Sequence, residues 1–179
     1  MDLLRIPSPV GELTCVVRNG GLVAVAFDGD GGGTIAKVRR RFAGDEMREA
    51  HEAGGVRAAF AEYFAGRISA LDTLAVDPGG TPFQAGVWMA LRDIGAGKTW
   101  SYEALARRVG APAAVRAVGA ANGANPIPLV LPCHRVIGKN GKLVGYGGGM
   151  DRKVWLLRHE GCEIGAQQPS KRRPLIRRA

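Results

Sequence analysis

The sequence lacks the features that mark membrane proteins, disulfide-rich proteins and zinc-binding proteins. No apolar run in its 179 residues approaches the roughly 20 residues that a membrane-spanning helix needs. Its three cysteines, Cys15, Cys133 and Cys162, cannot all pair and include no Cys-x-x-Cys motif, and there are only three histidines. The N-terminus has no basic region before an apolar stretch, so no signal peptide is predicted. We therefore expect a cytoplasmic protein without membrane span, disulfide framework, metal site or cofactor.

The remaining composition predicts a folded protein with an uneven charge. Hydrophobic residues make up 46% of the chain and charged residues 23%, and the length suits one domain or two small ones. The net charge is +9, but residues 1–80 carry nine basic and eleven acidic side chains, whereas residues 81–179 carry sixteen and five. A basic second half indicates a polyanionic partner, although such charge also serves solubility.

The first part of the chain is predicted to be small and β-rich. Residues 13–17 and 22–27 contain many β-branched side chains, and Asn19-Gly20-Gly21 between them is a hairpin signal. Two helices are predicted, a basic one over residues 34–43 and another over residues 56–65. Because Asp77-Pro78-Gly79-Gly80 is typical of a linker, we expect an N-terminal domain of residues 1–77.

The second part, residues 78–164, is predicted to be a mostly helical domain. Its first helix has a recognisable start, in which Thr81 suits the N-cap, Pro82 the first turn and Gln84 a capping box. Trp88 is expected to lie beside the buried face of this helix. The residues predicted to form that face are Phe83, Val87, Met89, Ala90, Leu91 and Ile94.

Two short helices then predict a helix-turn-helix. Ser101 suits the N-cap of a helix over residues 102–109, and Pro112 precedes a second helix over residues 113–121. The second helix is rich in alanine and has Arg116 as its only charged residue, so its thin surface permits close approach to a groove. Ordinary packing of an alanine-rich helix is the alternative interpretation.

A cysteine next to a histidine is the strongest candidate for chemistry. The motif Pro132-Cys133-His134-Arg135-Val136 follows an apolar run over residues 127–131, which predicts a buried strand. Cys133 is either a reactive thiolate or a small buried apolar residue. Arg135 favours the thiolate, because a neighbouring cation lowers a thiol pKa. A last helix is predicted over residues 151–160, and the basic tail of residues 165–179 is predicted to be disordered.

Several motifs follow one another between Thr81 and Gly161 in an order that is specific to one family. They are Thr81-Pro82-Phe83-Gln84, Ser101-Tyr102, Arg116-Ala117-Val118-Gly119, Asn125-Pro126, Pro132-Cys133-His134-Arg135-Val136, Gly145-Tyr146-Gly147-Gly148 and His159-Glu160-Gly161. In these motifs the chain resembles the O6-alkylguanine-DNA alkyltransferases, or methylated-DNA–protein-cysteine methyltransferases. Residues 1–80 resemble the variable N-terminal domain of this family only loosely. The resemblance implies an α+β protein, with a small β-rich N-terminal domain and a helical C-terminal domain that contains a helix-turn-helix.

The resemblance also implies a DNA repair protein that acts once. Such a protein binds double-stranded DNA through the minor groove and flips an O6-alkylated guanine out of the duplex. It then transfers the alkyl group to its own cysteine. Whether O4-alkylthymine is also a substrate is left open by the sequence. We expect a monomer that needs no metal, cofactor or membrane, and cooperative binding to DNA is also left open.

Residue roles follow from the matched motifs. By resemblance Cys133 accepts the alkyl group, His134 is the base that acts through a water, and Glu160 orients and polarises His134. Arg116 fills the gap left by the flipped base, and Asn125 braces the turn before the cysteine. Tyr102 contacts the rotated phosphate or the guanine edge. The residues expected to contact DNA or the base are Tyr102, Arg116, Asn125, Arg135, Tyr146, Gly147 and Gly148.

Other functions fit the sequence less well. A DNA-binding module without chemistry, like the alkyltransferase-like proteins, would lack an acceptor cysteine, but Cys133 is present. A cysteine hydrolase would use the same Cys-His pair and would leave the helix-turn-helix and the basic half unexplained. A fused zinc-binding regulatory domain needs a cysteine cluster before residue 80, where only Cys15 lies, so a transcription-activator role is not expected.

Overall fold

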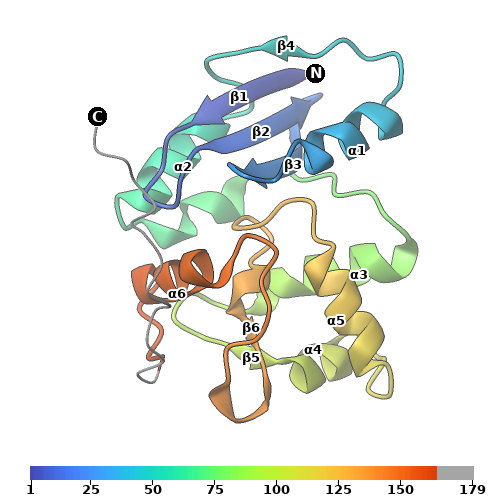
Figure 1. Cartoon of the computed structure of the whole chain (residues 1–179), viewed down its shortest axis with the longest axis vertical. Helices are drawn as coiled ribbons and strands as arrows, with labels where there is room; N and C mark the ends of the chain where they lie inside the picture. Colours follow the sequence, from blue (N-terminus) through green and yellow to red (C-terminus); the bar gives the residue numbers. More distant parts are fainter. Residues whose placement is uncertain (165–179) are drawn as a thin grey trace. The chain divides into compact units, whose positions relative to one another are not determined.

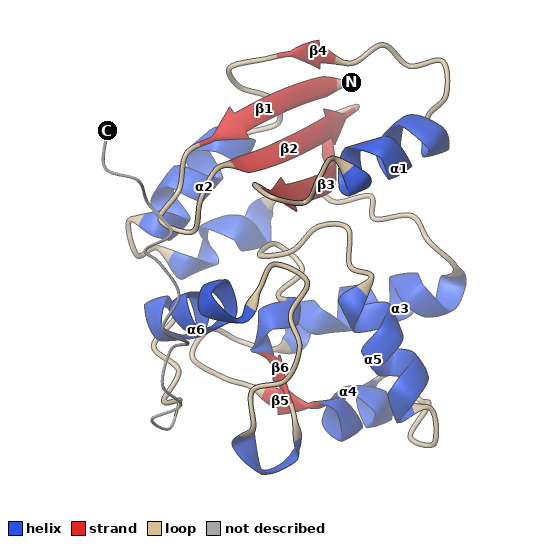
Figure 2. Ribbon diagram, viewed as in Figure 1, coloured by secondary structure: helices blue, strands red, loops and turns tan. Residues whose placement is uncertain are grey.

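The structure is a computed structural model that describes residues 1–164, and these residues form two compact units. Of the described residues, the first unit contains 1–78 and 126–128, and the second contains 79–125 and 129–164. The first unit contains a four-stranded sheet with helices and the second is mostly helical, which confirms the predicted α+β class (Figures 1 and 2). The division into independent domains at residues 77 and 78 stays a prediction, and the predicted disordered tail lies outside the described residues. No helix within residues 1–164 is long and apolar enough to cross a membrane.

A mixed sheet organises the first unit. The order of its strands is β3-β2-β1-β4, in which β2 pairs antiparallel with both β1 and β3, and β4 pairs parallel with β1. The predicted strands at residues 13–17 and 22–27 are confirmed as β2 and β3, whereas β1 and β4 are not among the predicted strands. The strands are β1 (Asp2–Ile6), β2 (Leu13–Arg18), β3 (Gly21–Phe27) and β4 (Arg48–Glu49).

A two-residue turn joins β2 to β3, as the sequence predicts. Arg18 pairs with Gly21, which leaves Asn19 and Gly20 as the loop, with φ angles of 50° and 78°. Asparagine and glycine adopt these left-handed angles with little strain, and the resulting turn has the same twist as the strands it connects. This local chemistry sets the register of the pairs next to the turn, and the register shifts at an irregularity between Val16 and Val17.

Two helices cover the sheet within the first unit. Helix α1 (Gly33–Arg41) contacts β3 and helix α2 (Val56–Phe64) contacts β1, and the 3-10 helix η1 (Ile68–Thr73) follows α2 (Figure 1). Val38 of α1 packs on Val16 and Val23 in a buried cluster. Both predicted helices are therefore confirmed, with ends one or two residues from those predicted.

Short elements dominate the second unit. Helices α3, α4 and α5 contact one another, and α6 contacts the 3-10 helix η3 (Figure 2). The helices are α3 (Pro82–Ala90), α4 (Tyr102–Arg108), α5 (Val115–Gly123) and α6 (Met150–His159), and the 3-10 helices are η2 (Leu91–Asp93), η3 (Cys133–Arg135) and η4 (Lys139–Gly141). Strands β5 (Trp100–Ser101) and β6 (Val136–Ile137) pair in parallel, which joins the start of α4 to the residues after η3.

The two helices of the predicted helix-turn-helix are α4 and α5. The Ser101 hydroxyl accepts a hydrogen bond from the Ala104 N–H, as expected of an N-cap. The predicted start of the second helix at residue 113 is wrong. A turn closed by the hydrogen bond from the Ala114 N–H to the Ala111 carbonyl occupies residues 111–114, so α5 begins at Val115.

The predicted buried face of α3 is partly wrong. Phe83 and Met89 are 40% and 45% exposed, whereas Trp88, expected beside the face, is only 3% exposed. The Trp88 Nε1–H donates to the Ala121 carbonyl over 2.7 Å, which ties α3 to α5. Contact with α5 therefore turns the Trp88 side of the helix inward, a choice that helical periodicity alone does not determine.

The strand predicted over residues 127–131 does not form, although most of this run is buried, as predicted. Its residues form bends and turns, and Leu129 has a φ of 72°. Pro126, Pro128 and Pro132 each lack the N–H group that a strand ladder requires. Cys133 therefore begins the 3-10 helix η3 after a compact turn and does not follow the end of a strand.

We predict that the capping box of α3 stabilises the second unit measurably. The Thr81 hydroxyl accepts from the Gln84 N–H, and the Gln84 side chain accepts from the Thr81 N–H. Thr81→Ala should lower the free energy of unfolding by about 1 kcal/mol, measured by urea denaturation. Thr34→Ala is the matched control, because its N–H in the first turn of α1 is bound by the Asp30 carboxylate and not by a threonine hydroxyl, and it should change stability by less than about 0.5 kcal/mol. Equal effects would show that the cap contributes nothing specific.

Candidate active site

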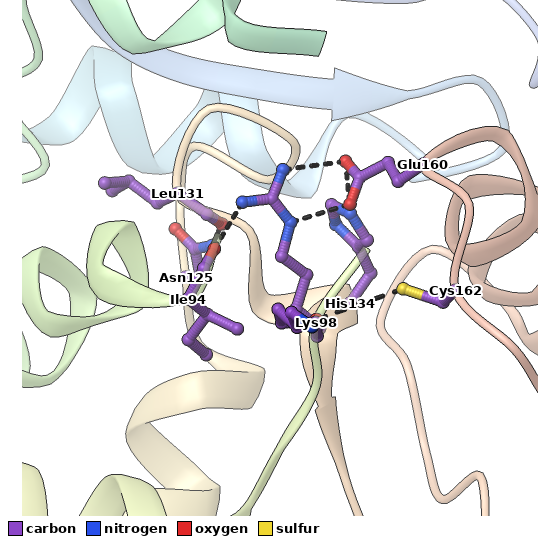
Figure 3. A network of polar contacts seen from close by, with 8 residues as sticks. Ile94, Lys98, Asn125, Leu131, His134, Glu160 and Cys162 are labelled. Atoms are coloured by element: carbon purple, nitrogen blue, oxygen red, sulfur yellow. Dashed lines mark hydrogen bonds and ion pairs between the residues drawn. The ribbon is translucent and has the colours of Figure 1, made fainter. Parts of the chain in front are cut away.

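The side chain of Cys133 lies inside the second unit at the start of η3. It is 6% exposed, and its backbone N–H donates to the Leu131 carbonyl over 2.7 Å. Asn125 Nδ2 donates to the same carbonyl over 2.7 Å (Figure 3). This bond holds the two ends of the segment between α5 and the cysteine together. This is the contact that the predicted bracing role of Asn125 requires.

A buried hydrogen bond joins His134 to Glu160. His134 Nε2 and Glu160 Oε1 are 3.0 Å apart, and both side chains are fully buried (Figure 3). Glu160 is the C-cap residue of α6, and Gly161 follows it with a φ of 78°, an angle that favours glycine. The end of α6 therefore places the Glu160 carboxylate against His134, the residue after the cysteine.

The same carboxylate also binds Arg135. Arg135 Nε and Nη2 lie 2.7 Å and 2.9 Å from Glu160 Oε2 and Oε1, and Nη1 donates to the Ile94 carbonyl over 2.5 Å. Arg135 is only 6% exposed. This position does not favour the predicted contact with DNA or the base. Arg135 instead holds Glu160 in place, because its planar guanidinium matches both carboxylate oxygens.

These contacts set the charge states of Glu160 and His134. Burial by itself would raise the pKa of Glu160, but the hydrogen bonds and charges of His134 and Arg135 outweigh it and bring the pKa to about 2. Burial lowers the pKa of His134, against the opposing effect of Glu160. At neutral pH the pair is therefore an ionised carboxylate and a neutral imidazole. The carboxylate accepts from Nε2–H, so Nδ1 carries the lone pair that a base needs.

Nδ1 is the ring nitrogen of His134 that is not bonded to Glu160. It is buried and has no hydrogen-bond partner among residues 1–164. The ring of Tyr146 lies edge-on to the imidazole, with 6.5 Å between the ring centroids. Tyr146 thus belongs to the same cluster as His134, as its motif suggests. Gly147 and Gly148 form the turn that follows, and the Gly148 carbonyl accepts from Arg152 Nη1 over 3.0 Å.

The expectation that Arg135 lowers the pKa of Cys133 is wrong. Burial raises the pKa of the Cys133 thiol, because a thiolate loses its hydration inside the protein. A hydrogen bond with Asn125 and the positive charge of Lys153 act in the opposite direction. Arg135 is engaged by Glu160, so the cation that acts on the thiol is Lys153.

Lys153 is a residue of the site that sequence reasoning missed. It is fully buried, and its Nζ donates to the carbonyls of Val136 and Val144 over 2.6 Å and 3.0 Å. Burial lowers its pKa to about 8, while the charge of Cys133 opposes that shift. A signal was present, because Lys153 precedes Leu156 and Leu157 by three and four residues and so shares their buried helix face.

Tyr102 and Arg116 lie on the two helices of the helix-turn-helix. Tyr102, the first residue of α4, is partly buried, and burial followed by the charge of Cys133 raises its pKa. Arg116 is exposed on α5, together with Ala117 and Ala120. The structure thus brings Tyr102 close enough to Cys133 for their charges to interact, and it leaves Arg116 on a thin outer face.

The described residues offer no metal site of the usual kind. Within residues 1–164, no group of three or more His, Cys, Asp or Glu side chains is arranged to hold a metal ion. Cys15 and Cys162 are buried and unbridged, and burial raises the pKa of both thiols. Cys133 differs from both because His134 follows it directly, and His134 is hydrogen-bonded to Glu160.

A helix-turn-helix with an alanine-rich outer face, and a buried His-Glu pair directly after a cysteine, are typical of a DNA-modifying protein that uses a thiol. Residues 82–162 match the model of the family "6-O-methylguanine DNA methyltransferase, DNA binding domain". The Methylated-DNA--protein-cysteine methyltransferase of Salmonella typhimurium is 54% identical over 127 residues, which cover 71% of this chain and 74% of that protein. The protein of the same name from Haemophilus influenzae is 38% identical over 154 residues, or 86% and 83% of the two chains.

Solved structures show the same similarity. The crystal structure of Mycobacterium tuberculosis OGT in complex with DNA superposes with a TM-score of 0.77 at 39% identity, covering 90% of this chain and 93% of that chain. The chain therefore belongs to the methylated-DNA–protein-cysteine methyltransferases. It is a DNA repair enzyme that transfers an alkyl group to a cysteine.

We predict that ionised Glu160 stabilises the folded protein and that this stabilisation is lost at low pH. Its pKa in the folded protein is about 2, below the usual 4.5, so the stabilisation is present above pH 4.5 and is lost as the pH falls towards 2. The loss should amount to about 3 kcal/mol at most, measured as the free energy of unfolding against pH. Glu160→Gln should flatten this part of the curve. Glu49→Gln, which alters an exposed ion pair, should leave it unchanged.

We also predict that Lys153 raises the thiolate fraction of Cys133. Lys153→Met should slow the reaction of Cys133 with iodoacetamide at pH 7 by about tenfold, followed by peptide mapping. The difference should fade above pH 8, because Lys153 has a pKa of about 8 and loses its charge there. Lys142→Met, at an exposed position, is the control. A loss that stays constant across pH would assign Lys153 a purely structural role.

Proposed function

We propose that Cys133 is the alkyl acceptor and that His134 and Glu160 activate it. The observation that carries this assignment is the buried contact between His134 Nε2 and Glu160 Oε1, which leaves Nδ1 as the basic nitrogen. A neighbouring base activates a thiol, and a third group orients the base, as in other nucleophilic enzymes. The two other cysteines among residues 1–164, Cys15 and Cys162, have no adjacent histidine.

The transfer is a displacement at the alkyl carbon. His134 Nδ1 takes the proton of the Cys133 thiol through a bridging water, and Glu160 stabilises the imidazolium that forms. The sulfur then attacks the carbon attached to O6 of guanine, so an S–C bond forms while the C–O6 bond breaks. The electron pair of that bond stays on the purine, which takes the proton back from His134. The thioether is not readily hydrolysed, so each molecule reacts once.

The burial of the Cys133 thiol supports the proposal that the alkylated base is flipped out of the duplex. Cys133 is 6% exposed, so a guanine inside a duplex stack cannot reach it. We propose that double-stranded DNA is bound through its minor groove by the outer face of α5, where Arg116, Ala117 and Ala120 are exposed. Small side chains allow this helix close to the groove, and Arg116 fills the gap that the base leaves. Tyr102 contacts the rotated phosphate or the base edge.

Several finer assignments belong to the same proposal. The protein acts as a monomer in the cytoplasm on DNA that carries O6-alkylguanine. Tyr146, Gly147 and Gly148 contact the flipped base, which the place of the Tyr146 ring beside His134 supports. The basic second half of the sequence supports a footprint on a polyanion.

Intact-mass analysis tests the acceptor. The protein mixed with a duplex that contains O6-methylguanine should gain the mass of one CH2 group, and peptide mapping should place it on Cys133. Cys133→Ala should gain nothing and still bind the duplex. Cys162→Ala, which removes another buried thiol, is the matched control and should react as the wild type does. A methyl group on Cys162, or repeated turnover, would overturn the assignment.

We predict that Arg116 acts on flipping and not on the transfer step. Arg116→Ala should slow repair of duplex O6-methylguanine by roughly tenfold, because the gap in the stack loses its filler. Reaction with free O6-benzylguanine, which needs no flipping, should keep its rate. Arg158→Ala, at an exposed position of α6, is a matched control for loss of one positive charge. Equal losses on both substrates would instead assign Arg116 to the fold or the pocket.

A further inference from the structure

Arg152 is a cation beside the proposed base-binding turn that the mechanism above does not use. It lies in the first turn of α6 and is half-buried. Its Nη1 donates to the Gly148 carbonyl over 3.0 Å. A long side chain gives up rotamer freedom to make such a contact, which a cation that serves only solubility does not need.

The turn that Arg152 contacts has a backbone that is easily deformed. Four of the five residues 145–149 are glycines, which adopt left-handed and right-handed conformations with similar ease. A Cβ on Gly145 or Gly149 would meet no atom within 4 Å apart from those of its chain neighbours. Side-chain packing therefore acts at Tyr146, whose ring lies beside His134, while the conformation of the glycines depends on hydrogen bonds.

Two hydrogen bonds fix one peptide group of this turn. The Gly149 N–H donates to the Tyr146 carbonyl over 2.9 Å, and the Gly148 carbonyl, which belongs to the same peptide group, accepts from Arg152. Because a peptide group is planar, bonds at both of its ends set its orientation. The orientation of the preceding peptide group, between Gly147 and Gly148, is restricted as a result.

We propose that Arg152 is a positioning residue, which holds the turn of Gly147 and Gly148 in the conformation that accepts the flipped base. The proposal rests on the proposed function, in which this turn contacts the base, and adds a residue to it. Without Arg152 the glycines sample several conformations, and the apparent dissociation constant of the base rises by the inverse of the competent fraction. Once the base is bound, the turn has the same conformation with or without Arg152, so the rate of the transfer step is unchanged.

Saturation kinetics with free O6-benzylguanine test this role without DNA binding or flipping, and the neutral base also removes any attraction by charge alone. Benzyl transfer to Cys133 is followed by intact mass at a series of O6-benzylguanine concentrations. Arg152→Met, which keeps an unbranched side chain without a donor, should raise the half-saturating concentration by about fivefold, the effect of one hydrogen bond, and leave the limiting rate unchanged. Arg158→Met, which removes an exposed positive charge from the same helix, is the matched control and should behave as the wild type does.

Amide hydrogen exchange, measured by NMR, tests the conformation of the turn directly. The Gly149 N–H should exchange about fivefold faster in Arg152→Met, because the orientation of its peptide group depends on the bond to Arg152. The Gly138 N–H donates to the Lys142 carbonyl over 2.7 Å in another turn of the second unit, and should keep its exchange rate as the internal reference. Arg152→Ala should show the same two effects and serves if Arg152→Met does not fold.

Two results would overturn the role of Arg152, and a third concerns a different claim. A wild-type half-saturating concentration in the Arg152 variants would show that the turn does not need Arg152 to accept the base. A lower limiting rate, accompanied by slower reaction of Cys133 with iodoacetamide, would show a general disturbance of the thiol instead. Failure of the wild type to accept a benzyl group would contradict the proposed function itself, so the two claims fail separately.

Discussion

The site depends on one buried carboxylate. Arg135 compensates the charge of Glu160, and His134 and Arg135 both form hydrogen bonds with its oxygens. A charge left unpaired inside a protein is strongly destabilising. The requirement therefore fixes the end of α6 against η3, and the Arg135 bond to the Ile94 carbonyl adds the segment after η2. The cysteine that begins η3 takes its position from this ionic cluster.

Burial has opposite consequences for the thiol and for the groups around it. It raises the pKa of Cys133 and so favours the unreactive protonated form, while it lowers the pKa of His134 and keeps the imidazole neutral and basic. Lys153 and Asn125 partly restore the thiolate. In the proposed mechanism, this balance protects the sulfur from electrophiles in solution and makes reaction depend on a substrate placed beside His134.

Very short elements connect the residues around Cys133 to the two helices of the helix-turn-helix. The two residue pairs of β5 and β6 place the start of α4, and hence Tyr102, beside the segment that follows Cys133. The bond from Trp88 to the Ala121 carbonyl fixes α5, whose inner side holds Tyr102 and whose outer side carries Arg116. One helix therefore connects the exposed face that carries Arg116 to the residues around Cys133.

The sequence by itself determined the features that rest on local chemistry and on motif order. The hairpin at Asn19 and Gly20, the capping box at Thr81 and the helix-turn-helix follow from short-range preferences, and the family follows from the motifs around Cys133. Only the tertiary structure decided which sides of the helices face inward, as for Trp88, and that a proline-rich turn replaces a strand before the cysteine. It also decided that Arg135 is buried and that Lys153 acts on the thiol, because burial and long-range ion pairs depend on neighbours far apart in the chain.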